Sequence, residues 1–116
     1  MSEQAIQQRI RLACSRGPVR LWRNNSGALR DANGQLVRFG LCEGSSDLIG
    51  FRSIEITPAM VGQRLAVFAA VEVKSQTGRP TAAQAAFLQQ VQKSGGIAGV
   101  ARSVAEAEQL LNASRV

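Results

Sequence analysis

Two oppositely charged side chains, Glu72 and Lys74, stand one residue apart at the end of an apolar run in the stretch AAVEVKS. If that run is a β-strand, both side chains point to the same face, because successive residues alternate between faces. Another acid, Asp47, opens a further apolar run in GSSDLIG. Two neighbouring carboxylates suit Mg²⁺ or Mn²⁺, which retain waters and accept a substrate phosphate oxygen. A lysine beside them can hold the attacking water and balance developing negative charge, so the pattern predicts metal-assisted phosphodiester hydrolysis.

The same residues also have a simpler interpretation, an ordinary ion pair at the end of a strand. A glutamate and a lysine at this spacing occur by chance in many proteins. The additional acid in a glycine-flanked turn before a neighbouring strand favours the catalytic interpretation. Histidine is absent, and the two cysteines, Cys14 and Cys42, lack the CxxC spacing. This excludes a zinc site of the usual kind and a histidine-based triad, and both cysteines are predicted to be small buried side chains.

The elements that must position these residues are two apolar runs, residues 47–57 and 64–74, separated by PAMVGQ. Their length and their proline- and glycine-bearing connection predict a long antiparallel β-hairpin. A register that places Asp47 opposite Lys74 would bring two acids and a lysine to one edge of the sheet.

The remaining elements follow from helical spacing, strand alternation and turn residues. Residues 3–15 are predicted to form an amphipathic helix with Ile6, Ile10 and Ala13 on one face and Gln7, Gln8 and Arg11 elsewhere. Further elements are a strand at 19–25, a hairpin or ordered loop at 26–40 around Asn33-Gly34, a helix opened by Pro80-Thr81 and ended by Gly95-Gly96, a strand at 97–101, and a helix to about Leu111. The order predicts one α/β (α+β) domain over residues 1–116, with a mixed sheet of about four strands flanked by helices.

Charge points to the partner. The chain has 14 lysines and arginines against 8 acids, for a net charge of +6. Arginine forks match phosphate oxygens, so a nucleic acid is the predicted partner. Hydrophobic residues make up 45% of the chain, which argues against disorder, and no apolar run approaches the roughly 18 residues of a membrane span. A soluble protein in the cytoplasm of a bacterial or phage-infected host cell is expected.

In combination, these residues resemble a known family. GSSDLIGF and EVKS resemble the core of the PD-(D/E)xK nucleases, and specifically the virus-type replication-repair nuclease domain, VRR-NUC. The resemblance extends over nearly the whole chain, through SEQAIQ, WRNNSG, RFGLCEGSSDLIG, EVKSQTGRPTAAQAAFLQQV and GGIAGVARS. In this extent the chain is similar to a stand-alone, phage-type member of the family. One departure is Ser46, where the superfamily motif has proline, a change that this family commonly tolerates.

The resemblance implies a restriction-endonuclease-like fold and assigns roles in the site. Asp47 and Glu72 would bind Mg²⁺ or Mn²⁺ together with the backbone carbonyl of Val73, and Lys74 would be the catalytic lysine. Glu3 matches the first-helix acid of the family; it precedes Ile6 by three residues, which places it on the same, inward helix face, although a favourable charge in a first turn is the alternative.

Gln84 matches a glutamine in the helix after EVK. It is either a support of the site or the second half of a capping box with Thr81, and its spacing with Phe87, Leu88 and Val91 favours the first. Candidate DNA contacts are Arg23, Asn24, Asn25, Ser45, Ser46, Arg79 and Arg102. Trp22 is expected in the core rather than as a base-stacking platform.

The function expected from the resemblance is a metal-dependent, structure-specific DNA endonuclease that resolves four-way (Holliday) junctions. Two symmetric incisions need two active sites, so a homodimer is expected, with its interface in IEITPAMVG or in the N-terminal segment. The alternatives are a monomeric flap or nicking nuclease and a non-catalytic DNA-binding module.

Overall fold

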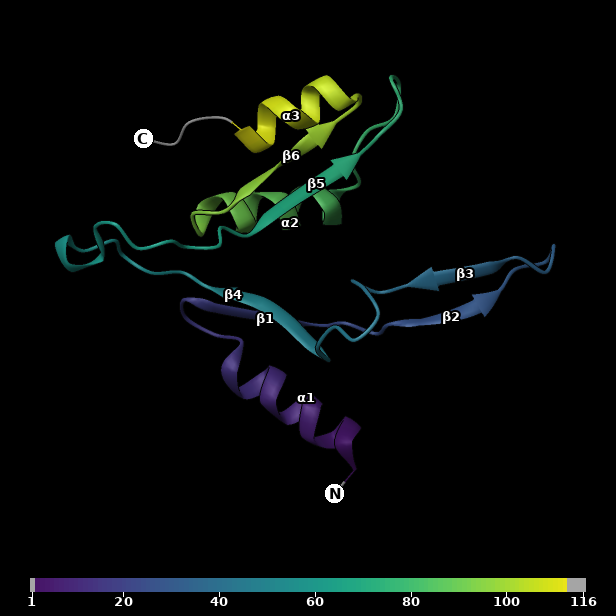
Figure 1. Cartoon of the computed structure of the whole chain (residues 1–116), viewed down its shortest axis with the longest axis horizontal. Coiled ribbons are helices and arrows are strands. Elements are labelled where there is room, and N and C mark those ends of the chain that lie inside the picture. The colour runs from purple at the N-terminus through teal and green to yellow at the C-terminus, as the bar shows by residue number, and fades with distance from the viewer. Residues whose placement is uncertain (1, 113–116) are drawn as a thin grey trace. The chain divides into compact units, whose positions relative to one another are not determined.

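The computed structural model describes residues 2–112 and divides the chain into two compact units, one ending at Ile54 and one beginning at Glu55. Helices and strands follow one another as α1, β1–β4, a short 3₁₀ turn, β5, α2, β6 and α3 (Figure 1). The predicted mixed α+β class is confirmed. Among the described residues, no helix is both long enough and apolar enough to cross a membrane.

The first unit is built on α1 (Glu3–Cys14) and an antiparallel pair of strands, β1 (Val19–Arg23) and β4 (Leu48–Arg52). The helix begins where the Ser2 hydroxyl accepts a hydrogen bond from the Ala5 N–H, a standard N-cap. In the strand pair, Arg23 lies opposite Leu48, so Asp47 immediately precedes the first paired residue of β4. The predicted helix and first strand are therefore confirmed.

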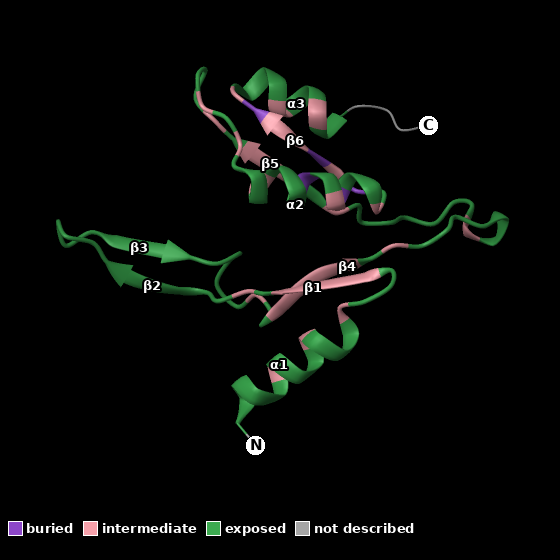
Figure 2. Cartoon of the chain, turned by 180° about the vertical axis from the view of Figure 1, so that it is seen from behind, coloured by how far each residue is buried: buried purple, intermediate pink, exposed green. Residues whose placement is uncertain are grey.

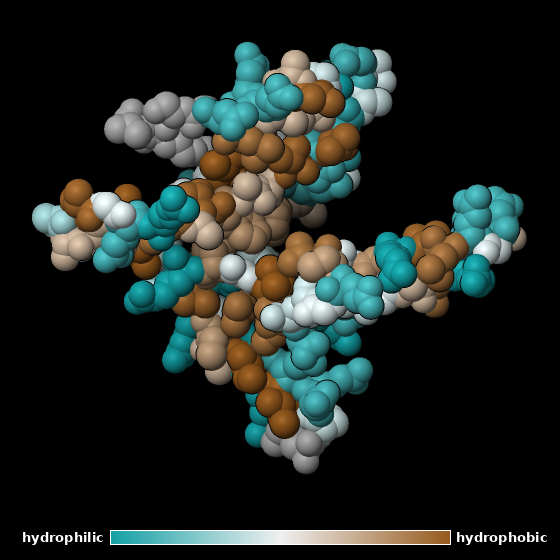
Figure 3. All heavy atoms as spheres, viewed as in Figure 1, coloured by the Kyte–Doolittle hydropathy of each residue, from teal (hydrophilic) through white to brown (hydrophobic). Residues whose placement is uncertain are grey.

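The face that α1 turns toward the strands differs from the predicted one. Gln7 and Arg11 are half-buried, whereas Ile6 and Ile10 are 43% and 44% exposed. Spacing identifies which residues share a face, but the neighbouring element decides which face it covers. Hydrophobic side chains consequently remain visible along α1 in the space-filling view (Figure 3).

A second antiparallel ribbon, β2 (Gly27–Arg30) and β3 (Leu36–Phe39), forms the predicted hairpin. At its tip the Asp31 carboxylate accepts hydrogen bonds from the N–H groups of Asn33 and Gln35, both at 2.9 Å. Gly34 has φ of 77°, a conformation that glycine adopts at little cost. The tight turn predicted at Asn33-Gly34 is therefore confirmed.

The second unit is a parallel strand pair, β5 (Ala69–Val73) and β6 (Ile97–Ala101), connected through α2 (Ala82–Lys93) and followed by α3 (Val104–Asn112). Both helices flank the strands (Figure 1). All four buried hydrophobic residues of the described chain lie in α2 and β6, namely Leu88, Val91, Ala98 and Ala101 (Figure 2). The 3₁₀ turn, Pro58–Met60, lies in the segment that leads into β5.

Two further predictions about the fold are wrong. The hairpin of residues 47–57 with 64–74 is replaced by two other pairings, β4 with β1 and β5 with β6, so Asp47 is not the strand partner of Lys74. Both cysteines are exposed rather than buried. Cys14 ends α1 and Cys42 lies in the loop before β4, and helix ends and loops usually lie at the surface because their unpaired backbone groups need water.

Candidate active site

Glu72 and Lys74 leave β5 on the same face, as strand alternation predicts. The Lys74 Nζ lies 3.6 Å from the Glu72 Oε2, and the two side chains are 20% and 27% exposed. The charges are thus partly withdrawn from water yet still reachable. A carboxylate that can bind a cation and an ammonium that can bind an anionic substrate thus lie two residues apart on the same face.

The backbone adds another oxygen. The Lys74 N–H donates to the Ala101 carbonyl of β6 at 3.2 Å. The peptide between Val73 and Lys74 is trans, so its carbonyl points opposite to its N–H. The Val73 carbonyl is therefore directed away from β6, toward the other edge of β5. A carboxylate and a carbonyl from adjacent residues are the hard oxygen donors that Mg²⁺ and Mn²⁺ accept.

The loop after Lys74 is fastened to the end of β6. The Arg102 guanidinium donates to the Gly78 carbonyl at 2.7 Å, and the Gly78 N–H donates to the Ser75 hydroxyl at 3.1 Å. Arg79, next along the loop, is exposed. Arg102 was predicted only as a DNA contact; in the structure it also holds the segment that follows the catalytic candidates.

Gln84 forms the capping box that was its alternative interpretation. Its N–H donates to the Thr81 hydroxyl at 3.1 Å, and its Oε1 accepts from the Thr81 N–H at 3.0 Å. The amide NH₂ of Gln84 has no hydrogen-bond partner among residues 2–112 and stays available to a ligand. Capping and site support are therefore compatible, and the second role stays a prediction.

In the first unit, Asp47 is exposed and stands at the end of a loop organised by Asn24. The Asn24 N–H donates to the Asp47 carbonyl at 2.8 Å, which extends the β1–β4 ladder by one bond. Its side-chain amide donates to the Ser45 hydroxyl at 2.7 Å and to the Ser46 carbonyl at 2.9 Å, and its Oδ1 accepts from the Leu41 N–H at 3.0 Å. One side chain thus ties both ends of the loop that carries Asp47.

The other predicted residues of this unit are more exposed. Glu3 lies in the first turn of α1 with an exposed side chain, rather than on an inward face. Arg23 donates from Nε to the Asn25 Oδ1 at 2.9 Å, which fixes its guanidinium and leaves the two terminal nitrogens for other partners. Arg23 is the last residue of β1, and Asn25 follows it by two residues.

A preformed metal cluster is not present in the described part of the chain, where no three histidine, cysteine or acidic side chains gather closely enough to hold a metal. The donors that the predicted site offers are carboxylate and carbonyl oxygens. These fit Mg²⁺ or Mn²⁺, which bind through one or two carboxylates and complete their shell with water and substrate oxygens.

The sequence indicated Asn24 and Arg102 as DNA contacts but not the hydrogen bonds by which they hold neighbouring loops. The signal for Asn24 was its place directly after a strand, where an amide satisfies loop backbone groups. Arg102 gave no such signal, because its acceptor, Gly78, is 24 residues away.

Comparison with known proteins gives one match. Residues 1–105 match the family model described as VRR-NUC domain, so the match spans both compact units. Among curated proteins and among solved structures, none matches the chain.

Proposed function

The chain belongs to the VRR-NUC family of nuclease domains, and from this we propose that it is a metal-dependent, structure-specific DNA endonuclease that resolves four-way junctions as a homodimer. In this proposal the two compact units act as one nuclease domain. The observation that carries it is the half-buried pair of Glu72 and Lys74 on one face of β5, with their charges 3.6 Å apart.

The proposed site assigns each residue a separate task. Asp47, Glu72 and the Val73 carbonyl would hold Mg²⁺ or Mn²⁺, which when bound makes a water more acidic and polarises the phosphate. Lys74 donates hydrogen bonds to the attacking water and to the negative charge that develops on the phosphate. Its ion pair with Glu72 holds the ammonium in place before substrate binds.

Further assignments concern support and DNA binding. We assign Gln84 and Glu3 to the support of the site. Asn24 would act chiefly by positioning the loop that carries Asp47, because its side chain is already used in three hydrogen bonds. The proposed phosphate contacts are Arg23, Asn25, Ser45, Ser46, Arg79 and Arg102.

A homodimer follows from the substrate, because a four-way junction is resolved by two symmetric incisions and each chain offers one site. The segment predicted to carry the interface supports this. Ile56 and Val61 are 77% and 83% exposed, and such large apolar side chains near each other in sequence suit contact with a second copy.

The test is cleavage of a labelled mobile four-way junction with Mg²⁺ or Mn²⁺. Wild type should make paired incisions, and Asp47→Ala and Lys74→Ala should each lower the rate by about 100-fold or more. Matched controls are Glu55→Ala and Arg64→Ala, which remove the same charges from residues outside the proposed site.

Mn²⁺ binding measured by calorimetry separates the proposed metal ligands from the proposed catalytic lysine. Binding should weaken in Asp47→Ala and Glu72→Ala and should persist in Lys74→Ala. Cleavage of flaps or linear duplex alone would remove the resolvase assignment and leave the site intact. Absence of cleavage on every substrate, with junction binding retained, would show a binding module instead.

A further inference from the structure

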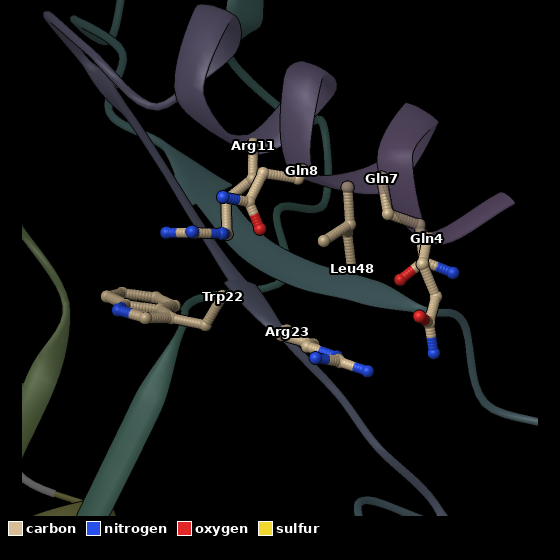
Figure 4. A pocket seen from close by; sticks show the side chains of 7 residues that line it. All are labelled: Gln4, Gln7, Gln8, Arg11, Trp22, Arg23 and Leu48. Atoms are coloured by element: carbon tan, nitrogen blue, oxygen red, sulfur yellow. The ribbon is translucent and has the colours of Figure 1, made fainter. Parts of the chain in front are cut away.

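A cavity of about 170 Å³ lies between α1 and the strands of the first unit (Figure 4). From α1 it is lined by Gln4, Gln7, Gln8 and Arg11, and from the strands by Trp22, Arg23 and Leu48. The close-up shows the α1 side chains extending toward the strands and Leu48 pointing back toward the helix. None of the four α1 residues had been assigned a role from the sequence.

The four α1 residues form a continuous helical stripe with spacing i, i+3, i+4 and i+7, the pattern by which a helix normally presents apolar residues to a sheet. Here every member of the stripe is polar. Within residues 2–112, none of these side chains makes a hydrogen bond or an ion pair to the protein, although Gln7 and Arg11 are half-buried. Gln4 and Gln8 are exposed, so the stripe is open to water, and its amides and guanidinium are available to hydrogen-bond a molecule that enters the cavity.

The lining defines the chemistry of that ligand. It contains two guanidinium groups, from Arg11 and Arg23, and no acidic side chain, which selects an anion. It also contains three primary amides, which offer both donors and acceptors and match the hydrogen-bonding edge of a nucleobase. Leu48 adds apolar surface for the face of a ring, while the Trp22 ring packs against Phe51 on the other face of the strand pair. A phosphate attached to a planar, hydrogen-bonding ring satisfies all three features.

Size and position narrow the ligand further. The small volume of the cavity fits one planar group rather than a base pair. Leu48 directly follows Asp47, and Arg23 lies opposite Leu48 in the strand pair. A group held in the cavity is therefore close along the chain to a proposed metal ligand.

We propose that this cavity receives an unpaired deoxynucleotide of a DNA strand, with its phosphate on Arg11 and Arg23 and its base edge on the glutamine amides. The choice of DNA rests on the proposed nuclease function. The nuclease would then favour DNA in which a nucleotide next to the scissile phosphate is unpaired, as at a branch point, over a continuous duplex.

Trp22 makes the test direct. It is the single tryptophan, and the chain has no tyrosine, so emission excited at 295 nm reports a residue of the cavity wall. Titration in EDTA at 150 mM salt, where no cleavage occurs, should show a saturable change in Trp22 emission with a five-nucleotide single strand. A blunt duplex of equal phosphate concentration should produce a much weaker change.

Variants locate the interaction. Arg11→Ala and Gln7→Ala should each weaken the single-strand affinity about tenfold, since each removes hydrogen bonds to the ligand, one of them to a charged group. Arg9→Ala is the matched control, because it removes the same charge from an exposed position of α1 that does not line the cavity. Arg11→Lys should recover only part of the affinity, because lysine lacks the planar fork. Far-UV circular dichroism confirms that each variant keeps its helix.

Three outcomes would overturn the proposal. Equal weakening by Arg9→Ala and Arg11→Ala would reveal general charge attraction rather than a site. The same emission change with inorganic phosphate alone would reduce the cavity to an anion site. If no single strand changes the Trp22 emission, the proposal that the cavity binds a nucleotide is wrong. Because the titration involves no cleavage, an inactive protein that still binds single strands through Arg11 would refute the proposed nuclease function alone.

Discussion

At the residue scale, Asn24 shows how one amide can order a loop that carries a proposed metal ligand. Its three side-chain hydrogen bonds reach Ser45, Ser46 and Leu41, and all of them hold the loop that leads to Asp47. Positioning of this kind matters because a metal ligand on a loose loop must lose conformational freedom when it binds.

Replacement of this amide gives the first prediction. Asn24→Ala should lower the free energy of unfolding by about 1–3 kcal/mol, because three polar partners lose their hydrogen bonds. Amide hydrogen exchange at Leu41 and Cys42 should accelerate. Asn25→Ala, which removes one exposed acceptor, is the control and should change neither quantity appreciably. Equal effects of the two replacements would contradict the positioning role.

At the element scale, the start of α2 carries two functions that can be separated. Thr81→Ala and Gln84→Ala should each destabilise the helix, by about 1 kcal/mol for the lost N-cap and by less for its reciprocal bond. Only Gln84→Ala should also lower the cleavage rate, because it alone removes the amide NH₂ proposed to support the site. Thermal unfolding and junction cleavage of both variants measure this, and equal activity in the two variants would restrict Gln84 to capping.

The β1–β4 pair gives another prediction at this scale. A Cβ at Gly50 would collide with the Arg20 carbonyl across the ladder. Gly50→Ala should therefore lower the unfolding free energy by about 2 kcal/mol or more. Gly62→Ala is the comparison, with open space around the site and φ of +85°, and should cost only about 1 kcal/mol. Urea unfolding midpoints test the difference, and a smaller loss at Gly50 would contradict the close approach.

These elements also show which features of the fold could be predicted from the sequence and which could not. The capping box at Thr81 and the Asn33-Gly34 turn are local, so their residues specify them without knowledge of the rest. The partner of β4 is not local. Alternation tells which side chains share a face and leaves open which strand lies alongside, and here β4 pairs with β1.

The same distinction applies to the site. Glu72 and Lys74 were predictable as a pair because one strand holds both. The polar stripe of α1 was visible in the spacing of Gln4, Gln7 and Arg11, but its turn toward the strands depends on packing that the helix alone does not determine. Roles that depend on a partner many residues away, such as that of Arg102, leave no local pattern.

At the scale of the whole molecule, the exposed apolar residues before β5 predict association. Wild type should sediment with the mass of two copies, and Val61→Lys should shift it toward one copy and reduce paired incisions more than single nicks. The reason is that a charge at a buried interface loses its water without gaining a partner.

A matched control is available in Gln63→Lys, which adds the same charge at an exposed polar position two residues away. It should leave the sedimented mass unchanged. A wild type that sediments as a single copy at concentrations where it makes paired incisions would contradict the homodimer.

The distribution of buried residues has a consequence for how the chain acquires its structure during synthesis. All four described core residues fall between Leu88 and Ala101, in elements adjacent along the chain. Contacts between near neighbours form fastest, because little chain entropy is lost in closing them. The second unit can therefore consolidate as soon as α2 and β6 have both left the ribosome. The segments with Asp47 and the α1 stripe emerge earlier and belong to the other compact unit, which contains none of these four residues.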